Sequence, residues 1–139
     1  VNGVTTTMGI GVTGTGVQRV VLASDDPCQA SGIAKSSVVL NVTTSAEVLA
    51  ISGTTIIYVC GYVATVGGTA PTYQFQYGTG TVCATGTTNL SGVFLPLVGS
   101  FQIYNPGMAG FATTAGQALC IATGGTTPSV QGVLTYVRR

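Results

Sequence analysis

Charge is the scarcest property of this chain. Only four Lys or Arg and three Asp or Glu occur in 139 residues, and residues 48–137 carry no formal charge. An ordinary soluble domain has about 25% charged residues, whereas this chain has 5%. Its net charge of +1 gives no electrostatic basis for binding nucleic acid or an anionic membrane. We infer that much of its surface is buried against other subunits or another particle.

The missing residue types also exclude most catalytic sites. Histidine is absent, so no Ser-His-Asp or Cys-His arrangement exists, and three carboxylates leave few candidates for acid–base catalysis. The Gly-rich segment YGTGTVCATGTTNLSG, residues 77–92, contains no lysine and precedes no helix-like segment. It therefore lacks the P-loop pattern that binds phosphate. We predict a protein that is not an enzyme, with no catalytic residues and no cofactor.

Long hydrophobic runs are missing too, although the mean hydropathy is +0.55. The longest apolar stretch, TTIIYVCGYVATV, is interrupted by threonines and a glycine. No segment reaches the roughly 18 apolar residues that a membrane-spanning helix needs. We therefore expect no membrane partner.

Four cysteines are present, Cys28, Cys60, Cys83 and Cys120, without C-x-x-C spacing. A zinc site would need all four of these widely spaced residues to converge, so no metal site is predicted. Two disulfides are possible in three connectivities, and a bridge such as Cys60–Cys120 would stabilise the fold by roughly 2–4 kcal/mol. Four buried thiols are the alternative.

Glycine, threonine and valine dominate the chain, which favours strands over helices. Short alternating runs lie between clusters of Gly, Ser, Asn and Pro: SSVVLNV, EVLAI, TIIYVCGYVAT, TYQFQYG, GVFLPLV, SFQIYN, QALCIAT and SVQGVLTYVRR. VGGTAP and GGTTP are predicted turns, the second closing a hairpin. About eight antiparallel strands at this spacing predict an all-β fold, an antiparallel β-sandwich of jelly-roll-like type.

The chain divides by composition into two parts. Residues 31–139 hold the predicted sandwich, and residues 1–30 form an extended N-terminal arm with one strand, VQRVVLAS. The arm is Gly-rich, and we expect it to become ordered only on a partner. The candidates for contact with another subunit or a capsid are Val4, Met8, Ile10, Val12, Val17, Arg19 and Val21, with the basic end Arg138 and Arg139, which is expected to be a solvated tail.

Several segments carry a resemblance to a known group of proteins. TGTGVQRVVLASDD is similar to an N-terminal segment of virion proteins of tailed bacteriophages. Three further segments resemble small phage proteins of the decoration, cement or fibre type: IYVCGY, YGTG followed by Cys and TGTT, and VQGVLTY. The resemblance implies a jelly-roll-like sandwich that oligomerises on the virion, often as a homotrimer. It also implies the major capsid protein as partner, on the outer surface of a head assembled in the bacterial host cytoplasm.

Two functions follow as expectations. The first is a capsid decoration protein that bridges capsomers and stabilises the head. The alternative is a tail-fibre, head-fibre or receptor-binding module that recognises host surface glycans, with Tyr73, Tyr77 or Tyr104 stacking on sugars. Tyr73 and Tyr77 alternate with glutamines in TYQFQYG, so core packing is the competing prediction for both.

Overall fold

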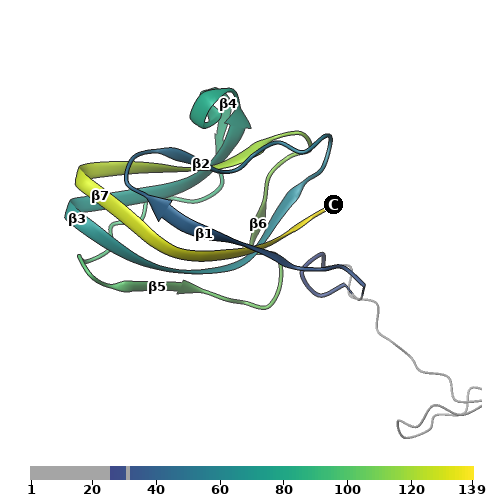
Figure 1. The fold of residues 1–139 in the computed structure, drawn as a ribbon, viewed down its shortest axis with the longest axis horizontal. Coiled ribbons are helices and arrows are strands. Elements are labelled where there is room, and N and C mark those ends of the chain that lie inside the picture. The colour runs from purple at the N-terminus through teal and green to yellow at the C-terminus, as the bar shows by residue number, and fades with distance from the viewer. Residues whose placement is uncertain (1–25, 31) are drawn as a thin grey trace, which may run out of the picture.

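The computed structural model describes residues 26–30 and 32–139, and this part of the chain is all-β (Figure 1). Its elements are β1 (Ser36–Val42), β2 (Ala46–Leu49), β3 (Ile57–Thr79), the short 3-10 turn η1 (Thr81–Cys83), β4 (Thr85–Asn89), β5 (Phe101–Tyr104), β6 (Phe111–Ala112) and β7 (Ala118–Arg138). All strand pairs between these elements are antiparallel. The predicted all-β class is confirmed, whereas jelly-roll connectivity stays a prediction. No helix among these residues is long and apolar enough to cross a membrane.

A ribbon of two long strands forms the centre of the fold. β3 pairs with β7 along almost its whole length, from Ile57 opposite Arg138 to Gly78 opposite Ala118. Register shifts fall between Gly67 and Thr72, and positive φ angles cluster there and in the paired part of β7. We call these two segments, residues 67–72 and 124–129, the corner. At the corner the ribbon bends, and both strands continue through it (Figure 1).

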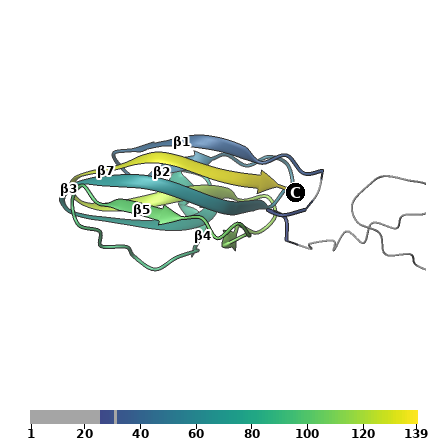
Figure 2. The ribbon, with the colours of Figure 1, turned by 90° about the horizontal axis from the view of Figure 1, so that it is seen from below.

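The bend creates two layers from one hydrogen-bonded sheet. The first layer holds β1, the C-terminal half of β7, the N-terminal half of β3, and β5. The second holds β2, the N-terminal half of β7, the C-terminal half of β3, and β4. Figure 2 shows the strands of the first layer side by side in the order β1, β7, β3, β5. This arrangement agrees with the predicted sandwich.

Some predicted elements are wrong. VGGTAP and GGTTP are not chain-reversing turns, and the predicted hairpin at GGTTP is absent, because the two segments pair with each other across the corner. Four predicted strands thereby become two. With GVFLPLV not a strand and two further short strands present, the described residues contain seven strands and not eight. GVFLPLV forms only an isolated bridge between Phe94 and Tyr73, since Pro96 cannot donate to a ladder.

Two short strands, β4 and β6, were not predicted. Every residue of β4 is exposed, and its sequence TGTTN has no apolar alternation. Pairing with β3 at Gln76 and Tyr77 holds it in place, so its strand conformation comes from a neighbour and not from its own pattern.

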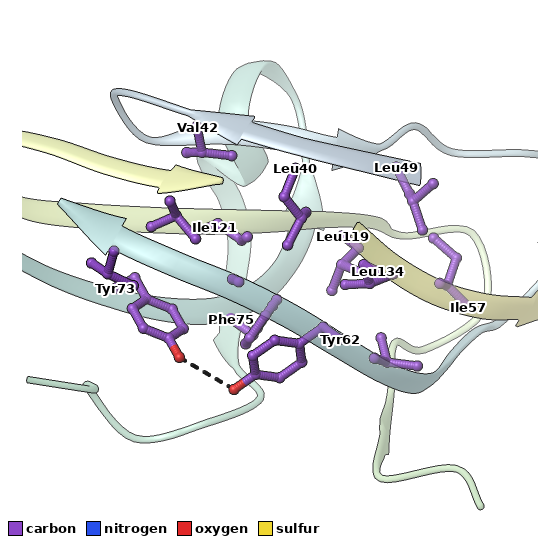
Figure 3. Close-up of a cluster of buried hydrophobic side chains, with 14 residues drawn as sticks. Leu40, Val42, Leu49, Ile57, Tyr62, Tyr73, Phe75, Leu119, Ile121 and Leu134 are labelled. Carbon is purple, nitrogen blue, oxygen red and sulfur yellow. Dashed lines mark hydrogen bonds between the residues drawn. The ribbon is translucent and has the colours of Figure 1, made fainter. Parts of the chain in front are cut away.

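The core lies between the two layers. Its buried members are Leu40, Val42, Leu49, Ile57, Val59, Tyr62, Ala64, Val66, Tyr73, Phe75, Leu119, Ile121, Val130 and Leu134 (Figure 3). In TYQFQYG the predicted alternation is confirmed at its centre, because Tyr73 and Phe75 are buried while the glutamines between and after them are only half-buried.

Most of the predicted arm, including the strand at residues 17–24, lies outside the described residues. The described chain starts with a turn at residues 26–30, in which the amides of Gln29 and Ala30 donate to the carbonyl of Asp26.

Candidate interaction surface

The outer face of the first layer carries a row of exposed apolar side chains. Val133 of β7 lies opposite Val39 of β1 on one side and opposite Val63 of β3 on the other. Val63 in turn lies opposite Ile103 of β5. These four residues, called the apolar row below, are 77%, 41%, 37% and 69% exposed, respectively. Residues opposite each other in neighbouring strands share a face. The row therefore crosses the whole width of the layer without interruption.

Uncharged polar groups border the row on both sides. Asn41, Gln131 and Thr65 occupy the next outward-facing positions on one side, and Phe101 continues that line on β5. On the other side lie Ser37, Thr135 and Gly61. An apolar centre with a polar border is the usual anatomy of a protein–protein interface.

A shallow hollow of about 90 Å³ adjoins the row. It is lined by Gly61, Tyr62, Val63, Tyr104, Asn105, Val133 and Thr135. Gly61 lacks a side chain for a steric reason, because a Cβ there would lie 2.7 Å from the carbonyl oxygen of Tyr104. The close passage of β3 and β5 thus requires glycine and leaves this depression in the face.

The remaining part of the same face is covered by the start of the described chain. The disulfide Cys28–Cys60 joins this segment to β3, and both cysteines are buried with Val137 against Ile33, Tyr58 and Ala109. The Asp26 carboxylate accepts hydrogen bonds from the amides of Ala109, at 2.9 and 3.0 Å, and Cys28, at 2.8 Å. The first described residue, Asp26, therefore lies at the same layer as the apolar row.

A second disulfide, Cys83–Cys120, ties η1 to β7. Both of its cysteines are fully buried. Of the two alternatives left open by the sequence, the structure has two bridges and no free thiol. The pairing Cys60–Cys120, given as an example above, is wrong, since Cys60 lies on the outer face of β3 while Cys120 faces η1.

The tyrosines proposed for sugar stacking are mostly engaged inside the protein. Tyr73 is 1% exposed, and its hydroxyl lies 3.3 Å from that of Tyr62 (Figure 3). Burial is the main cause that raises the pKa of both phenols above the ordinary value of 10.0. Tyr104 stacks on Tyr62 at 5.9 Å, and Tyr77 is half-buried. For Tyr73 the core interpretation is confirmed.

The predicted contact residues fall into two groups. Val4, Met8, Ile10, Val12, Val17, Arg19 and Val21 lie outside the described residues. The expectation of a solvated tail at the C-terminus is wrong for the backbone, because Arg138 belongs to β7 and Arg139 exchanges two hydrogen bonds with Ile56. The Arg138 guanidinium donates to the carbonyl of Ala50 at 2.9 Å and lies over the Tyr136 ring.

No set of three or more Cys, Asp or Glu in residues 26–30 and 32–139 is placed to hold a metal ion. The described carboxylates are Asp26, whose oxygens receive the amides named above, and the exposed Glu47 of β2. The face with the apolar row is a candidate surface for contact with another molecule.

The residues of that face were missed by the sequence interpretation. Val63 sits in TIIYVCGYVAT, which has apolar residues on both faces and was therefore expected to be covered on both sides. Val39 and Val133 were not singled out as exposed. SFQIYN does alternate, with Phe101 and Ile103 on one side and Gln102 and Tyr104 on the other. The larger apolar residues of this run were not recognised as the exposed set.

Comparison of the chain with protein-family models, with curated proteins and with solved structures gave no match.

Proposed function

We propose that this protein is a virion structural subunit, a decoration protein on the outer surface of a tailed-bacteriophage head. The observation that carries the proposal is the combination of almost no charge with an exposed, uninterrupted apolar row on a rigid sheet. Large exposed apolar surfaces rimmed by polar groups mark interaction sites. A surface of this composition suits permanent contact with other protein.

The role is mechanical and not chemical. Each subunit bridges capsomers through its N-terminal segment, residues 1–24, which contains the contact candidates Val4 to Val21. This segment precedes Asp26, whose carboxylate accepts from the Ala109 amide. The sandwich acts as the rigid body that the segment tethers, and its binding adds contacts that resist internal DNA pressure. The resemblance of several sequence segments to phage virion proteins is a second, independent support.

The two disulfides fit an extracellular particle. Reducing bacterial cytoplasm keeps thiols reduced, whereas released virions meet an oxidising medium. Each bridge closes a loop, with sequence separations of 32 and 37 residues, and stabilises by roughly 3–4 kcal/mol in the chain-entropy model. We propose that both bridges form after the head leaves the host cell.

Copy number tests the proposal directly. In a gel of purified virions, a decoration protein is expected at nearly the abundance of the major capsid protein. If the protein is present at only a few per cent of the abundance of the major capsid protein, the result would contradict a decoration protein and favour a fibre protein.

Truncation tests the proposed tether. Heads that lack the protein are incubated with the full chain or with a chain that lacks residues 1–24 and keeps the Cys28–Cys60 bridge. The truncated chain should occupy few sites at a concentration that saturates with the full chain. Full occupancy by the truncated chain would show that the tether is assigned wrongly.

A second candidate function is a glycan-binding fibre module. One observation favours it: Phe101, which is 70% exposed, lies in line with Thr65 and the amide side chains of Gln131 and Asn41. An exposed aromatic ring beside amide groups is the combination that stacks on and hydrogen-bonds to sugars. Binding of host surface polysaccharide that is lost in Phe101→Ala would favour this candidate.

A further inference from the structure

The part of the outer face of the first layer that carries the continuous apolar row has no partner among the described residues. We propose that it binds the same face of a second copy of this chain, around a two-fold axis that runs along the apolar row. This self-association is a property of the purified protein, although it uses the same apolar row that supports the proposed virion role.

The face that carries the apolar row is free of charges that would oppose such a contact. A two-fold axis along the row brings each residue of the row near its own counterpart and each border opposite the other border of the copy, so a charge in the row would meet a like charge. None of the outward-facing residues of β1, β7, β3 and β5 in the apolar row and its two polar borders is charged. Two copies can therefore approach without repulsion, and no buried charge is left unpaired.

The shape of the face also suits a two-fold contact. Rotation about an axis along the row places Val39 opposite Val39 of the copy and Ile103 opposite Ile103 of the copy. The same rotation reverses direction along the strands, so Phe101, on one side of the row, arrives on the other side. The hollow beside Gly61 and Asn105 lies on that side. Each copy thus brings an exposed aromatic ring to the depression of the other, which has room for part of that ring.

Sheet packing allows this arrangement. Two stacked sheets prefer strand directions within about 30° of each other, about 10 Å apart. An axis close to the perpendicular of the strands keeps the two sets of strands nearly aligned. The apolar row then forms the centre of a four-layered pair of sandwiches.

The area sets the expected strength. β1 is about 24 Å long and four strands are about 19 Å wide, which gives a projected face on the order of 400 Å² per copy. Standard interfaces bury about 800 Å² of accessible surface per partner, and a pleated face has more accessible surface than its projection. The contact belongs at the weaker end of specific interfaces, and we expect dimerisation in the micromolar range.

Charge substitutions at one position test the like-with-like pairing. The full-length chain with Ile103→Lys, the chain with Ile103→Glu, and an equimolar mixture are compared by sedimentation velocity from about 1 to 300 µM. We expect a dimer for the unchanged chain, at least about tenfold weaker association for each variant alone, and recovery in the mixture, where Lys meets Glu. The matched control is Val93→Lys, because Val93 is also exposed (54%) and precedes the bridge of Phe94 to the second layer.

Each remaining outcome overturns the proposal. If the unchanged chain is monomeric at all concentrations, the proposed contact does not form. If it forms a dimer or trimer whose stability is the same in the Ile103 variants, the contact lies on another surface. Failure of the mixture to recover would exclude the two-fold axis along the row. If deletion of residues 1–24 abolishes association as Ile103→Lys does, the face binds the N-terminal segment and not its own counterpart. Thermal unfolding of each variant checks that it is folded, which is expected because Ile103 is 69% exposed.

Discussion

At the scale of the residue, hydrogen bonding and close backbone contact explain why particular residue types occupy particular positions, which composition alone does not explain. Tyr62 and Tyr73 are the clearest pair, since each buried ring carries a hydroxyl that needs a partner, and each hydroxyl has the other at 3.3 Å. The alternation in TYQFQYG predicted the burial of Tyr73. It could not predict Tyr62 as the partner, because that contact depends on how β3 bends.

The tyrosine pair predicts a loss of stability in alkali. Burial raises the pKa of Tyr62 and Tyr73 in the folded state, so above pH 10 the unfolded chain loses protons that the folded chain keeps. The free energy of unfolding should therefore fall as pH rises through 10 and beyond, by up to about 1.4 kcal/mol per pH unit for each tyrosine. Urea unfolding at several values between pH 8 and pH 11 measures this slope.

The double variant Tyr62→Phe with Tyr73→Phe supplies the comparison. It should show a shallower slope, whereas Tyr77→Phe, which removes a hydroxyl outside the pair, should leave the slope unchanged. Equal slopes in all three proteins would contradict the assignment.

Gly61 predicts a second residue-scale effect. A Cβ at this position would lie 2.7 Å from the Tyr104 carbonyl oxygen, a backbone atom that cannot move without shifting β5. Gly61→Ala should therefore lower the free energy of unfolding by roughly 1–3 kcal/mol. Gly67→Ala is the matched control on the same strand, because its nearest contact is an ordinary 3.7 Å to the Ser129 Cβ. The two midpoints of urea unfolding should differ clearly, and equal midpoints would show that β5 adapts freely.

At the scale of the element, the alternation of apolar and polar residues predicted which segments form strands better than it predicted where those strands begin and end. β1, β2 and β5 lie where alternating runs were expected, and the runs on either side of the corner are also strands. Gly and Pro in VGGTAP and GGTTP indicate a break in regular structure, and a break does occur there. Sequence could not show that the two breaks face each other, since their pairing joins residues about 60 positions apart and a bend is as Gly-rich as a turn.

The corner predicts a stabilising substitution. Thr127 has a φ of 48°, a left-handed conformation that is unfavourable for a β-branched residue. Thr127→Gly should relieve that strain, and we expect a net gain of about 0.5–1 kcal/mol in the free energy of unfolding. Thr126→Gly, at a neighbouring position without positive φ, should instead be neutral or destabilising. Differential scanning calorimetry distinguishes the two, and a loss in Thr127→Gly would contradict the strain argument.

At the scale of the whole molecule, the shortage of charge was the most informative feature of the sequence. It predicted a surface that is buried against other protein, and it did so without locating that surface. The location depends on register, because a shift of one residue would turn Val39, Val133 and Val63 into the core. Only the paired strands place these side chains together with Ile103 on the outside.

The same shortage predicts the salt response of self-association. Attraction between exposed charges is screened as ionic strength rises, whereas apolar contact is not weakened by sodium chloride. Association of the full chain should therefore be unchanged or stronger between about 50 and 500 mM sodium chloride, a range over which the screening length falls severalfold. Sedimentation at both concentrations measures it, and a steep loss at high salt would indicate a charged contact in place of the neutral face.

The ribbon of β3 and β7 has a mechanical consequence. Cys28, near the start of the described chain, is fastened to β3 at Cys60, and the C-terminus is the end of β7, at the same end of the same ladder (Figure 1). A pull that separates these two points loads the hydrogen bonds between the two strands one after another, starting with the pair between Ile56 and Arg139, instead of all together. A subunit held by its N-terminal segment alone feels no such load, because nothing pulls on its C-terminus. The fold therefore resists tension best when the C-terminus is left unattached, and a cargo fused there should be linked through a slack spacer.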